Sequence, residues 1–253
     1  MIRRMEKTVP GDENLLKGPA GLRLLCAEKV YAGRPFFSVW AQEGPAGGRT
    51  AYLSALDGAY TLTAAADADF AELAAFLTLL GAKTVFCSVQ TGRALGWSAR
   101  RKGVALRLDE ELPAEDPGDW TGELRLHPSP GRIYEVLAAC AGEAIQMPER
   151  MAFHADLSHR IRHGGGRCLL WETGGRDIAC AVALESDAGA YISGVAVLPA
   201  YREKGIGSRL LLCLDRLLLK EHRTIWTLAR RDEAPFYERQ GFVPDGEWGW
   251  FAP

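Results

Sequence analysis

A short segment rich in glycine and positive charge carries the clearest chemical signal in the sequence. Residues 202–209 read Arg-Glu-Lys-Gly-Ile-Gly-Ser-Arg, so three cations, Arg202, Lys204 and Arg209, are opposed by a single glutamate. Glycine beside positive charge at this density is typical of a site for a phosphate or another anion. The chemistry that the segment predicts is the binding of a phosphorylated ligand.

The position of this segment between a strand and a helix supports that prediction. Residues 191–198 form an apolar run that Pro199 ends, and a long apolar pattern of helical period follows over residues 206–221. The first turn of a helix has unpaired N–H groups and a partial positive charge. Gly205 and Gly207 let an anion approach those groups with no Cβ in the way. We therefore expect a phosphate cradle at the start of this helix.

Two common phosphate-binding motifs do not fit the segment. A Walker loop requires G-x-x-x-x-G-K-[ST], and the chain has no such run. A dinucleotide fingerprint requires a third glycine where Leu210 stands, and the antiparallel hairpin expected over residues 168–185 also disfavours a Rossmann-type domain. The pattern that remains is R-x-x-G-x-G after an apolar strand, formed by Arg202, Gly205 and Gly207.

A second motif stands later in the chain, where residues 236–242 read Phe-Tyr-Glu-Arg-Gln-Gly-Phe. The two motifs, with a helix and a strand between them, resemble the GNAT N-acetyltransferase superfamily over about residues 123–251. The resemblance implies an α/β fold with a mixed sheet in the C-terminal half. It also implies an acyltransferase that moves an acetyl group from acetyl-CoA to a primary amine of a small molecule or a protein.

The resemblance further implies roles for particular residues. Tyr237 would be the general acid that protonates the leaving thiolate, and a tyrosine with a pKa of about 10 is a proton donor at neutral pH. The apolar strand would contact the pantetheine arm and the thioester, and the cradle amides would hold the pyrophosphate. The residues implied to bind acetyl-CoA are Val195, Ala196, Val197, Arg202, Glu203, Lys204, Gly205, Ile206, Gly207 and Ser208.

A general base is harder to find in the sequence. The apolar strand carries no carboxylate, so Glu172 and Glu185, expected on neighbouring strands, are the base candidates. Residues 230–232 read Arg-Arg-Asp where members of the family often carry asparagine. These departures leave an alternative to the enzyme open, namely a non-catalytic acyl-CoA-binding or regulatory module with the same fold.

Proline and glycine divide the chain into two parts. Four of the 13 prolines fall within residues 113–131, and proline removes backbone donors and restricts the residue before it. We interpret residues 113–122 as a linker. It would join a smaller N-terminal α/β domain, residues 1–112, to a GNAT domain, residues 123–253.

The N-terminal part resembles a faded copy of the C-terminal part. A shift of 138 residues (205 minus 67) places residues 70–80 on residues 208–218, and helix, strand, helix and strand then recur in order. Two aspartates, Asp67 and Asp69, fall on the cradle glycines, where carboxylates would repel phosphate, and Ala99 falls on the catalytic tyrosine. We therefore expect a degenerate, GNAT-like N-terminal domain that is non-catalytic and does not bind CoA.

Periodicity and turn residues predict the remaining elements. Expected strands in the N-terminal part cover residues 34–43, 50–64 and 84–87, around a helix over residues 70–80. In the C-terminal part, we expect strands over residues 123–126, 168–172, 178–185, 191–198 and 224–228 and from residue 241, and helices over residues 133–141, 148–163, 206–221 and 235–240. Gly194, inside a strand, predicts a bulge or a close backbone approach.

Composition limits the partners that we expect. The 253 residues are 47% hydrophobic and 25% charged with a net charge of −2, so no basic excess predicts nucleic-acid binding. No apolar run approaches the roughly 18 residues of a membrane span, and the first residues show no signal peptide. The expected partner is a small-molecule or peptide amine, and the sequence leaves the oligomeric state open.

The cysteines indicate the compartment. The chain has six, and no two form a C-x-x-C pair, so we expect neither a redox motif nor a cysteine-rich metal site. Buried free thiols are typical of a cytoplasmic protein, which is the location that we expect.

The domain division predicts where a protease first cuts the chain. Linkers with few crossing contacts are preferred sites of nicking. Limited digestion of the native protein, followed by mass spectrometry, is expected to give its earliest cuts within residues 113–131. Earliest cuts within residues 140–240 would contradict the division.

Overall fold

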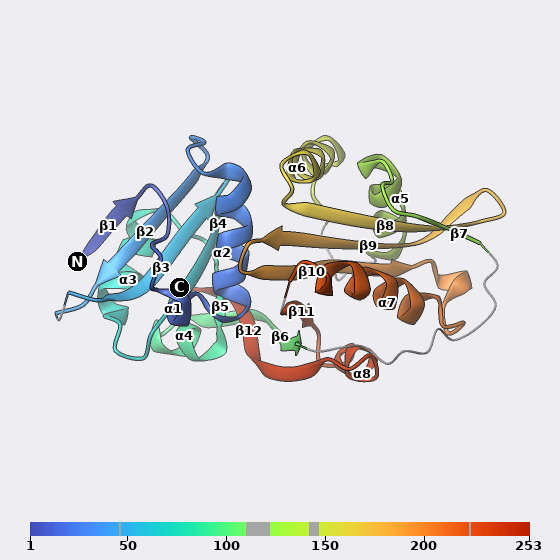
Figure 1. The fold of residues 1–253 in the computed structure, drawn as a ribbon. Coiled ribbons are helices and arrows are strands. Elements are labelled where there is room, and N and C mark those ends of the chain that lie inside the picture. Colours follow the sequence, from blue (N-terminus) through green and yellow to red (C-terminus); the bar gives the residue numbers. More distant parts are fainter. Residues whose placement is uncertain (46, 110–121, 142–146, 223) are drawn as a thin grey trace. The chain divides into compact units, whose positions relative to one another are not determined.

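The computed structural model describes residues 1–45, 47–109, 122–141, 147–222 and 224–253. The chain separates into two compact units, each a sheet with helices packed on it (Figure 1). Unit 1 comprises Met1–Leu106, Leu228–Pro235 and Val243–Pro253, and unit 2 comprises Arg107–Thr227 and Phe236–Phe242. The predicted α/β class with mixed sheets is confirmed.

Unit 1 is built from the N-terminal elements and the last strand of the chain. Its strands lie in the order β1-β2-β3-β4-β5-β12-β6. In chain order its elements are β1 (Ile2–Met5), α1 (Glu13–Leu16), α2 (Gly18–Tyr31), β2 (Phe37–Glu43), β3 (Arg49–Leu56), β4 (Ala59–Ala64), α3 (Phe70–Leu79), β5 (Val85–Ser88), α4 (Val89–Ala94), β6 (Ser98–Leu108, of which the unit holds all but the last two residues) and β12 (Val243–Ala252).

Unit 2 carries both motifs that the sequence singled out. Its strands lie in the order β11-β10-β9-β8-β7. Its elements are β7 (Glu123–Arg125), α5 (Pro130–Ala141), α6 (Arg150–Arg162), β8 (Gly166–Thr173), β9 (Arg176–Ser186), β10 (Gly189–Val197), the 3-10 turn η1 (Pro199–Tyr201), α7 (Ile206–Leu219), most of β11 (Ile225–Ala229) and part of α8 (Ala234–Glu238).

The order of elements repeats along the chain. From β1 to β6 the order is one strand, two helices, three strands, then helix, strand, helix and strand, and the same order runs from β7 to β12. The correspondence that the sequence suggested, of α3 with α7 and of β5 with β11, is therefore present in the fold. The elements that were not predicted, β1, α1 and α2, lie in the first copy, and α4 and β6 were predicted only through the repeat.

The two compact units do not follow a single cut in the sequence. Unit 1 includes the strand β12 from the far end of the chain, and this strand pairs antiparallel with β5 from Trp248 opposite Ser88 to Phe251 opposite Val85. Residues 113–122, the predicted linker, lie outside the described residues except for Gly122. The division at that linker stays a prediction.

The sheet of unit 2 contains an irregularity next to the predicted cradle. Strand β10 pairs antiparallel with β9 from Gly189 to Val197, and its register shifts between Ile192 and Gly194. The bulge that Gly194 predicted is therefore present. On its other side β10 pairs in parallel with β11 from Ala190 to Ile192. A bulge inserts an extra residue and increases the local twist, which redirects the strand after it.

Helix α7 holds the cradle in place because its apolar face is buried on the sheet. It packs against β8, β9 and β10, and its buried face carries Leu210, Leu211, Leu214 and Leu218. Among the helices of the described chain, none is both long enough and apolar enough to cross a membrane.

One acid interrupts this apolar face. Asp215 is fully buried, and neither of its carboxylate oxygens has a hydrogen-bond partner among the described residues. Burial raises the pKa of Asp215 well above its ordinary value of 3.8, because a charged form would lose its hydration with nothing in exchange. The acid is therefore held in its neutral form until the pH approaches the raised value.

Asp215 predicts a stability that falls as pH rises. In the folded chain its pKa is raised, so the folded state holds the proton after the unfolded state has lost it. The free energy of unfolding should therefore fall by up to about 1.4 kcal/mol per pH unit above the unfolded pKa. Asp215→Asn lacks this titration. Urea unfolding of both proteins from pH 4 to 8 should show wild type losing stability relative to the variant, and parallel pH profiles would contradict the burial.

Candidate active site

The loop before α7 adopts a backbone that leaves its amides open. It leaves η1 at Tyr201 and contains two residues with left-handed backbone, Glu203 with φ of 61° and Gly205 with φ of 75°. Gly205 is the N-cap of α7, and no side chain caps the helix there. A side chain at Gly205 would meet no atom within 4 Å, so glycine is favoured by its positive φ rather than by crowding.

The amides of residues 203–208 form the candidate anion site. The first bond of the helix is that from Arg209 N to Gly205 O, at 3.1 Å. Within the described chain, no hydrogen bond leaves the backbone N–H groups of residues 203–208. Unpaired amides at a helix N-terminus, aligned with its dipole, bind phosphate and carboxylate groups.

The corresponding helix of unit 1 differs at this point. At the start of α3, the side chain of Asp69 accepts a hydrogen bond from Glu72 N at 2.9 Å. Gln42 accepts one from Asp69 N at 3.0 Å and donates one to Glu72 Oε2 at 2.7 Å. This N-terminus is therefore occupied by the protein's own side chains and by negative charge. Helices α3 and α7 hold corresponding places in the repeated order of elements, so one chain contains a capped and an uncapped version of the same helix start.

Two cations of the loop fix its path. Arg202 Nε donates to Val197 O at 2.9 Å, which ties the loop to the end of β10. Lys204 Nζ donates to Ala200 O at 3.1 Å and lies 5.5 Å from the ring centre of Tyr201. Both side chains are exposed, so their positive charge also faces solvent beside the open amides.

The end of β10 lies directly before this loop. Val195 and Val197 are half-buried while Ala196 is buried, so two apolar side chains stay partly accessible on a strand that is otherwise buried toward its start. All three residues lie beyond Ile192, the last position of the parallel register with β11. The strand end therefore offers apolar side chains and backbone groups next to the cradle.

Tyr237 lies near the cradle because its neighbour in the chain, Phe236, lies close to Gly207. A Cβ at Gly207 would lie 3.4 Å from Val197 Cγ2 and 3.6 Å from Phe236 Cζ, so α8, the helix start and the strand end meet there. The Phe236 and Tyr237 rings are edge-to-face at 5.0 Å, and Tyr237 and Phe242 at 5.8 Å. Tyr237 itself is 9% exposed. Phe236 belongs to the second sequence motif, but no part in the site was predicted for it.

Glu172 is held by arginines. It lies at the end of β8, and Arg132 NH2 contacts its Oε2 at 2.6 Å, with Arg125 Nε at 3.6 Å. The hydrogen bond from Arg132 lowers the pKa of Glu172. Its neighbour Trp171 is in register with Ala179, which faces Val197, so Glu172 lies about two strand spacings, roughly 10 Å, from β10.

Glu185 lies at the opposite end of the sheet from the cradle. It faces Ala190 in the register with β10, five residues before Val195, which is about 16 Å along a strand. Arg167 Nε donates to Glu185 Oε1 at 3.0 Å, and His222 Nε2 lies 2.9 Å from Oε2. Burial raises the pKa of Glu185, but the hydrogen bonds from His222 and Arg167 outweigh it, so the pKa is lowered.

The structure thus brings together the strand end, the cradle and the helix of Tyr237, and it places neither glutamate beside them. Glu185, Glu221 and His222 lie close enough to bind a metal, with ligand atoms within 4.8 Å of one another. Arg167 already contacts both carboxylates, at 3.0 and 2.8 Å, so their charge is balanced by a guanidinium.

Comparisons with known proteins agree with this geometry. The family model of the acetyltransferase (GNAT) domain matches residues 164–244, which include the cradle and Tyr237. No curated protein matches the chain in sequence.

Solved structures match the whole chain. A GCN5-related N-acetyltransferase from Sphaerobacter thermophilus shares 15% identity at a TM-score of 0.64, covering 100% of this chain and 95% of its own. A tandem GNAT protein from the clavulanic acid biosynthesis pathway shares 15% identity at 0.61, covering 100% and 98%. A GNAT-family acetyltransferase from Colwellia psychrerythraea shares 12% identity at 0.60, covering 100% and 99%.

The family match covers about a third of the chain and falls in the C-terminal part, where the two motifs predicted a GNAT domain. The structural likeness over the full length shows that the repeated order of elements is a GNAT fold present twice.

A matched pair of substitutions tests the cradle. Gly207→Ala adds a Cβ at ordinary contact distance from Val197 and Phe236, so it should leave CoA binding nearly unchanged. Gly207→Glu adds a carboxylate beside the open amides. Like charges brought together cost several kcal/mol, so CoA affinity measured by calorimetry should fall by about a hundredfold or more. Equal affinities for the two variants would contradict a phosphate site at this helix.

Proposed function

We propose that unit 2 is an N-acetyltransferase that moves an acetyl group from acetyl-CoA to a primary amine of a small molecule or a protein. The observation that carries the proposal is the uncapped N-terminus of α7, since the same helix in unit 1 is capped by Asp69 and Gln42. An open set of amides in one copy and a closed set in the other matches a single site for a pyrophosphate.

The chain's own groups fit the parts of acetyl-CoA, which supplies an activated thioester when bound. The amides of residues 203–208 suit the pyrophosphate, with Arg202 and Lys204 adding positive charge. The partly exposed Val195 and Val197 suit the apolar stretch of the pantetheine arm. Holding the thioester and the amine in one geometry should supply much of the rate.

Tyr237 has the position of a proton donor in this proposal. Its helix meets the cradle through Phe236, and the edge-to-face contacts with Phe236 and Phe242 fix the direction of its ring. The Oη proton would pass to the leaving sulfur, which a phenol can give at neutral pH.

Neither of the two glutamates is assigned as the acceptor of the proton that the attacking amine loses. The pKa of Glu172 and that of Glu185 are both lowered, and a weaker base accepts a proton less well at neutral pH. We propose that both serve mainly the sheet, Glu172 through Arg132 and Glu185 through Arg167 and His222. An amine that arrives neutral would attack the carbonyl, and the proton that its nitrogen then loses would pass through a water at the strand end to solvent or back to the Tyr237 oxygen.

We also propose that the protein works in the cytoplasm. All six cysteines are free and four of them are buried, namely Cys26, Cys87, Cys168 and Cys180. Burial raises the pKa of Cys87 and of Cys168 to about 12, so these thiols stay protonated and unreactive.

Tyr237→Phe tests the general acid. Removing the hydroxyl should leave acetyl-CoA affinity nearly unchanged, because the phosphates and pantetheine are held by other groups. Turnover should fall by about 10²–10⁴, the usual contribution of one acid–base group. The measurement is thiol release from acetyl-CoA against a panel of amines, with affinity determined on the same samples.

Phe242→Leu is a control that keeps the hydroxyl and changes only the packing under it. It should lower turnover much less than Tyr237→Phe. Unchanged turnover in Tyr237→Phe would contradict the general-acid role. Binding of acetyl-CoA by wild type with no turnover on any amine would favour the non-catalytic module instead.

A further inference from the structure

Unit 1 contains a pocket of about 840 Å³ whose lining residues all belong to that unit. It opens where two parallel strands end. Strands β4 and β5 pair at Tyr60 opposite Val85 and Thr61 opposite Phe86, and the residues that follow on both strands line the pocket. Ligands of open α/β sheets bind at the carboxyl ends of parallel strands, and 300–1,000 Å³ is the usual size of a small-molecule site.

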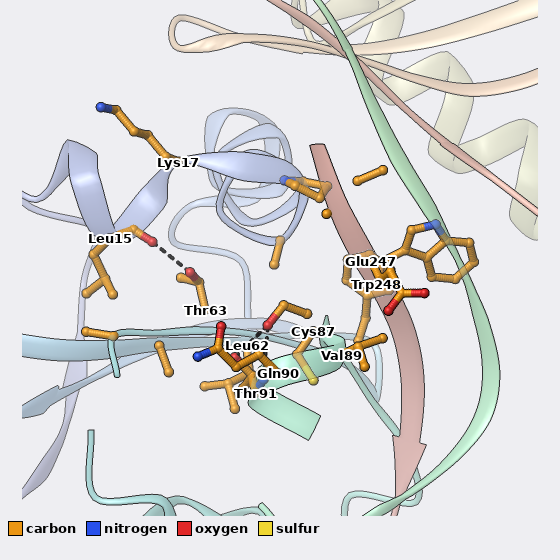
Figure 2. A pocket seen from close by; sticks show the side chains of 18 of the residues that line it. Leu15, Lys17, Leu62, Thr63, Cys87, Val89, Gln90, Thr91, Glu247 and Trp248 are labelled. Carbon is orange, nitrogen blue, oxygen red and sulfur yellow. Dashed lines mark hydrogen bonds between the residues drawn. The ribbon is translucent and has the colours of Figure 1, made fainter. Parts of the chain in front are cut away.

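Distant segments build the walls (Figure 2). Helix α1 closes one side, and its Leu15 carbonyl accepts a 2.6 Å hydrogen bond from Thr63 of β4. Gln90 and Thr91 of α4 lie below, and Trp248 of β12 forms another wall. Phe86 and Trp248 are nearly fully buried, with ring centres 5.6 Å apart, so they support the pocket from behind. The apolar side chains of the lining that stay partly exposed include Leu15, Pro19 and Ala64.

The counterpart of the unit 2 cradle is closed in unit 1. The helix that follows β4 is α3, and its N-terminus is capped by Asp69 and hydrogen-bonded to Gln42. A pyrophosphate held as we propose for unit 2 would therefore find no open amides at this helix, and we expect charged side chains of the pocket to recognise its ligand.

The charged side chains that line the pocket differ in whether the protein already provides them with a partner. Asp12 is neutralised, since its Oδ2 accepts from Tyr52 at 2.6 Å and from Arg49 at 3.2 Å. Glu247 forms an ion pair with Arg231. A third acid of the lining, Asp245, is exposed and also has an interaction within the protein. Each of these three acids therefore already interacts with another group of the protein.

Two arginines keep donors to spare. The Nε of Arg49 is buried with no hydrogen-bond partner among the described residues, and Arg49 is only 26% exposed. Arg93 also lines the pocket, and the described chain provides no acid that pairs with it. Lys17 extends away from the other labelled side chains, so it is left out of this count (Figure 2). A buried donor without a partner is costly, and a carboxylate is the ligand group that guanidinium binds best.

The geometry points to a second ligand site in this chain: the pocket of unit 1 binds a small organic carboxylate, with Arg49 and Arg93 receiving the carboxylate and the partly exposed Leu15, Pro19 and Ala64 packing against its apolar part. This site is separate from the proposed acetyl-CoA site, and it gives the N-terminal copy a function that needs no catalysis.

The test uses a matched pair of probes, 2-naphthoate and its neutral analogue 2-naphthamide, which share one aromatic body. Calorimetry on the full chain should show one saturable site for naphthoate and at least about tenfold weaker binding of the amide, since a charged hydrogen bond contributes roughly 1.5–3 kcal/mol. Saturating CoA should leave naphthoate binding unchanged.

Variants locate the site. Arg49→Met and, separately, the exposed Arg93→Gln should each weaken naphthoate binding about tenfold or more. Arg34→Met, an exposed arginine of the same unit outside the pocket, should not change it. The proposal is overturned if naphthoate does not saturate at millimolar concentration, if the amide binds equally well, if CoA displaces naphthoate, or if neither Arg93→Gln nor a folded Arg49→Met weakens binding.

Discussion

The N–H groups in the first turn of a helix need partners, and this chain satisfies that need in two ways. In α3 the side chains of Asp69 and Gln42 provide the partners, so the helix start is closed. In α7 the N-cap is Gly205, which has no side chain to offer, and the amides of residues 203–208 stay open. A helix N-terminus with open amides attracts an anion. We propose that the strand end, the loop and the helix of Tyr237 in unit 2 are arranged around an anion bound there.

Those features converge on the same point from separate elements. The bulge in β10 redirects the strand before it reaches the loop, and Arg202 ties that loop to Val197. Phe236 lies beside Gly207 at the start of α7, which brings the helix of Tyr237 to the cradle. In unit 1 the equivalent strands also part at their carboxyl ends, but there the space is a pocket lined by Arg49 and Arg93. We propose that one fold thus supplies two sites of different chemistry, one at each pair of strands.

Much of unit 2 could be predicted from the sequence because its signals are local. Pro199 follows the end of β10, Gly205 marks the start of α7, and the turn after Thr173 marks the hairpin. Helix α2 escaped prediction because its buried residues lie on more than one face and leave no single apolar stripe. The surroundings of the two glutamates, and the contact of Arg49 with Asp12, depend on residues far apart in sequence, so no local pattern reports them.

The most direct test of the central claim compares the two helix starts within one sample. Hydrogen–deuterium exchange of the full chain is measured with and without saturating CoA, and the amides of residues 203–208 are read against those of residues 69–73. We predict slower exchange at residues 203–208 on adding CoA and no change at residues 69–73, because only the first set is free to bind phosphate. Unchanged exchange at residues 203–208, or equal protection of both segments, would contradict it.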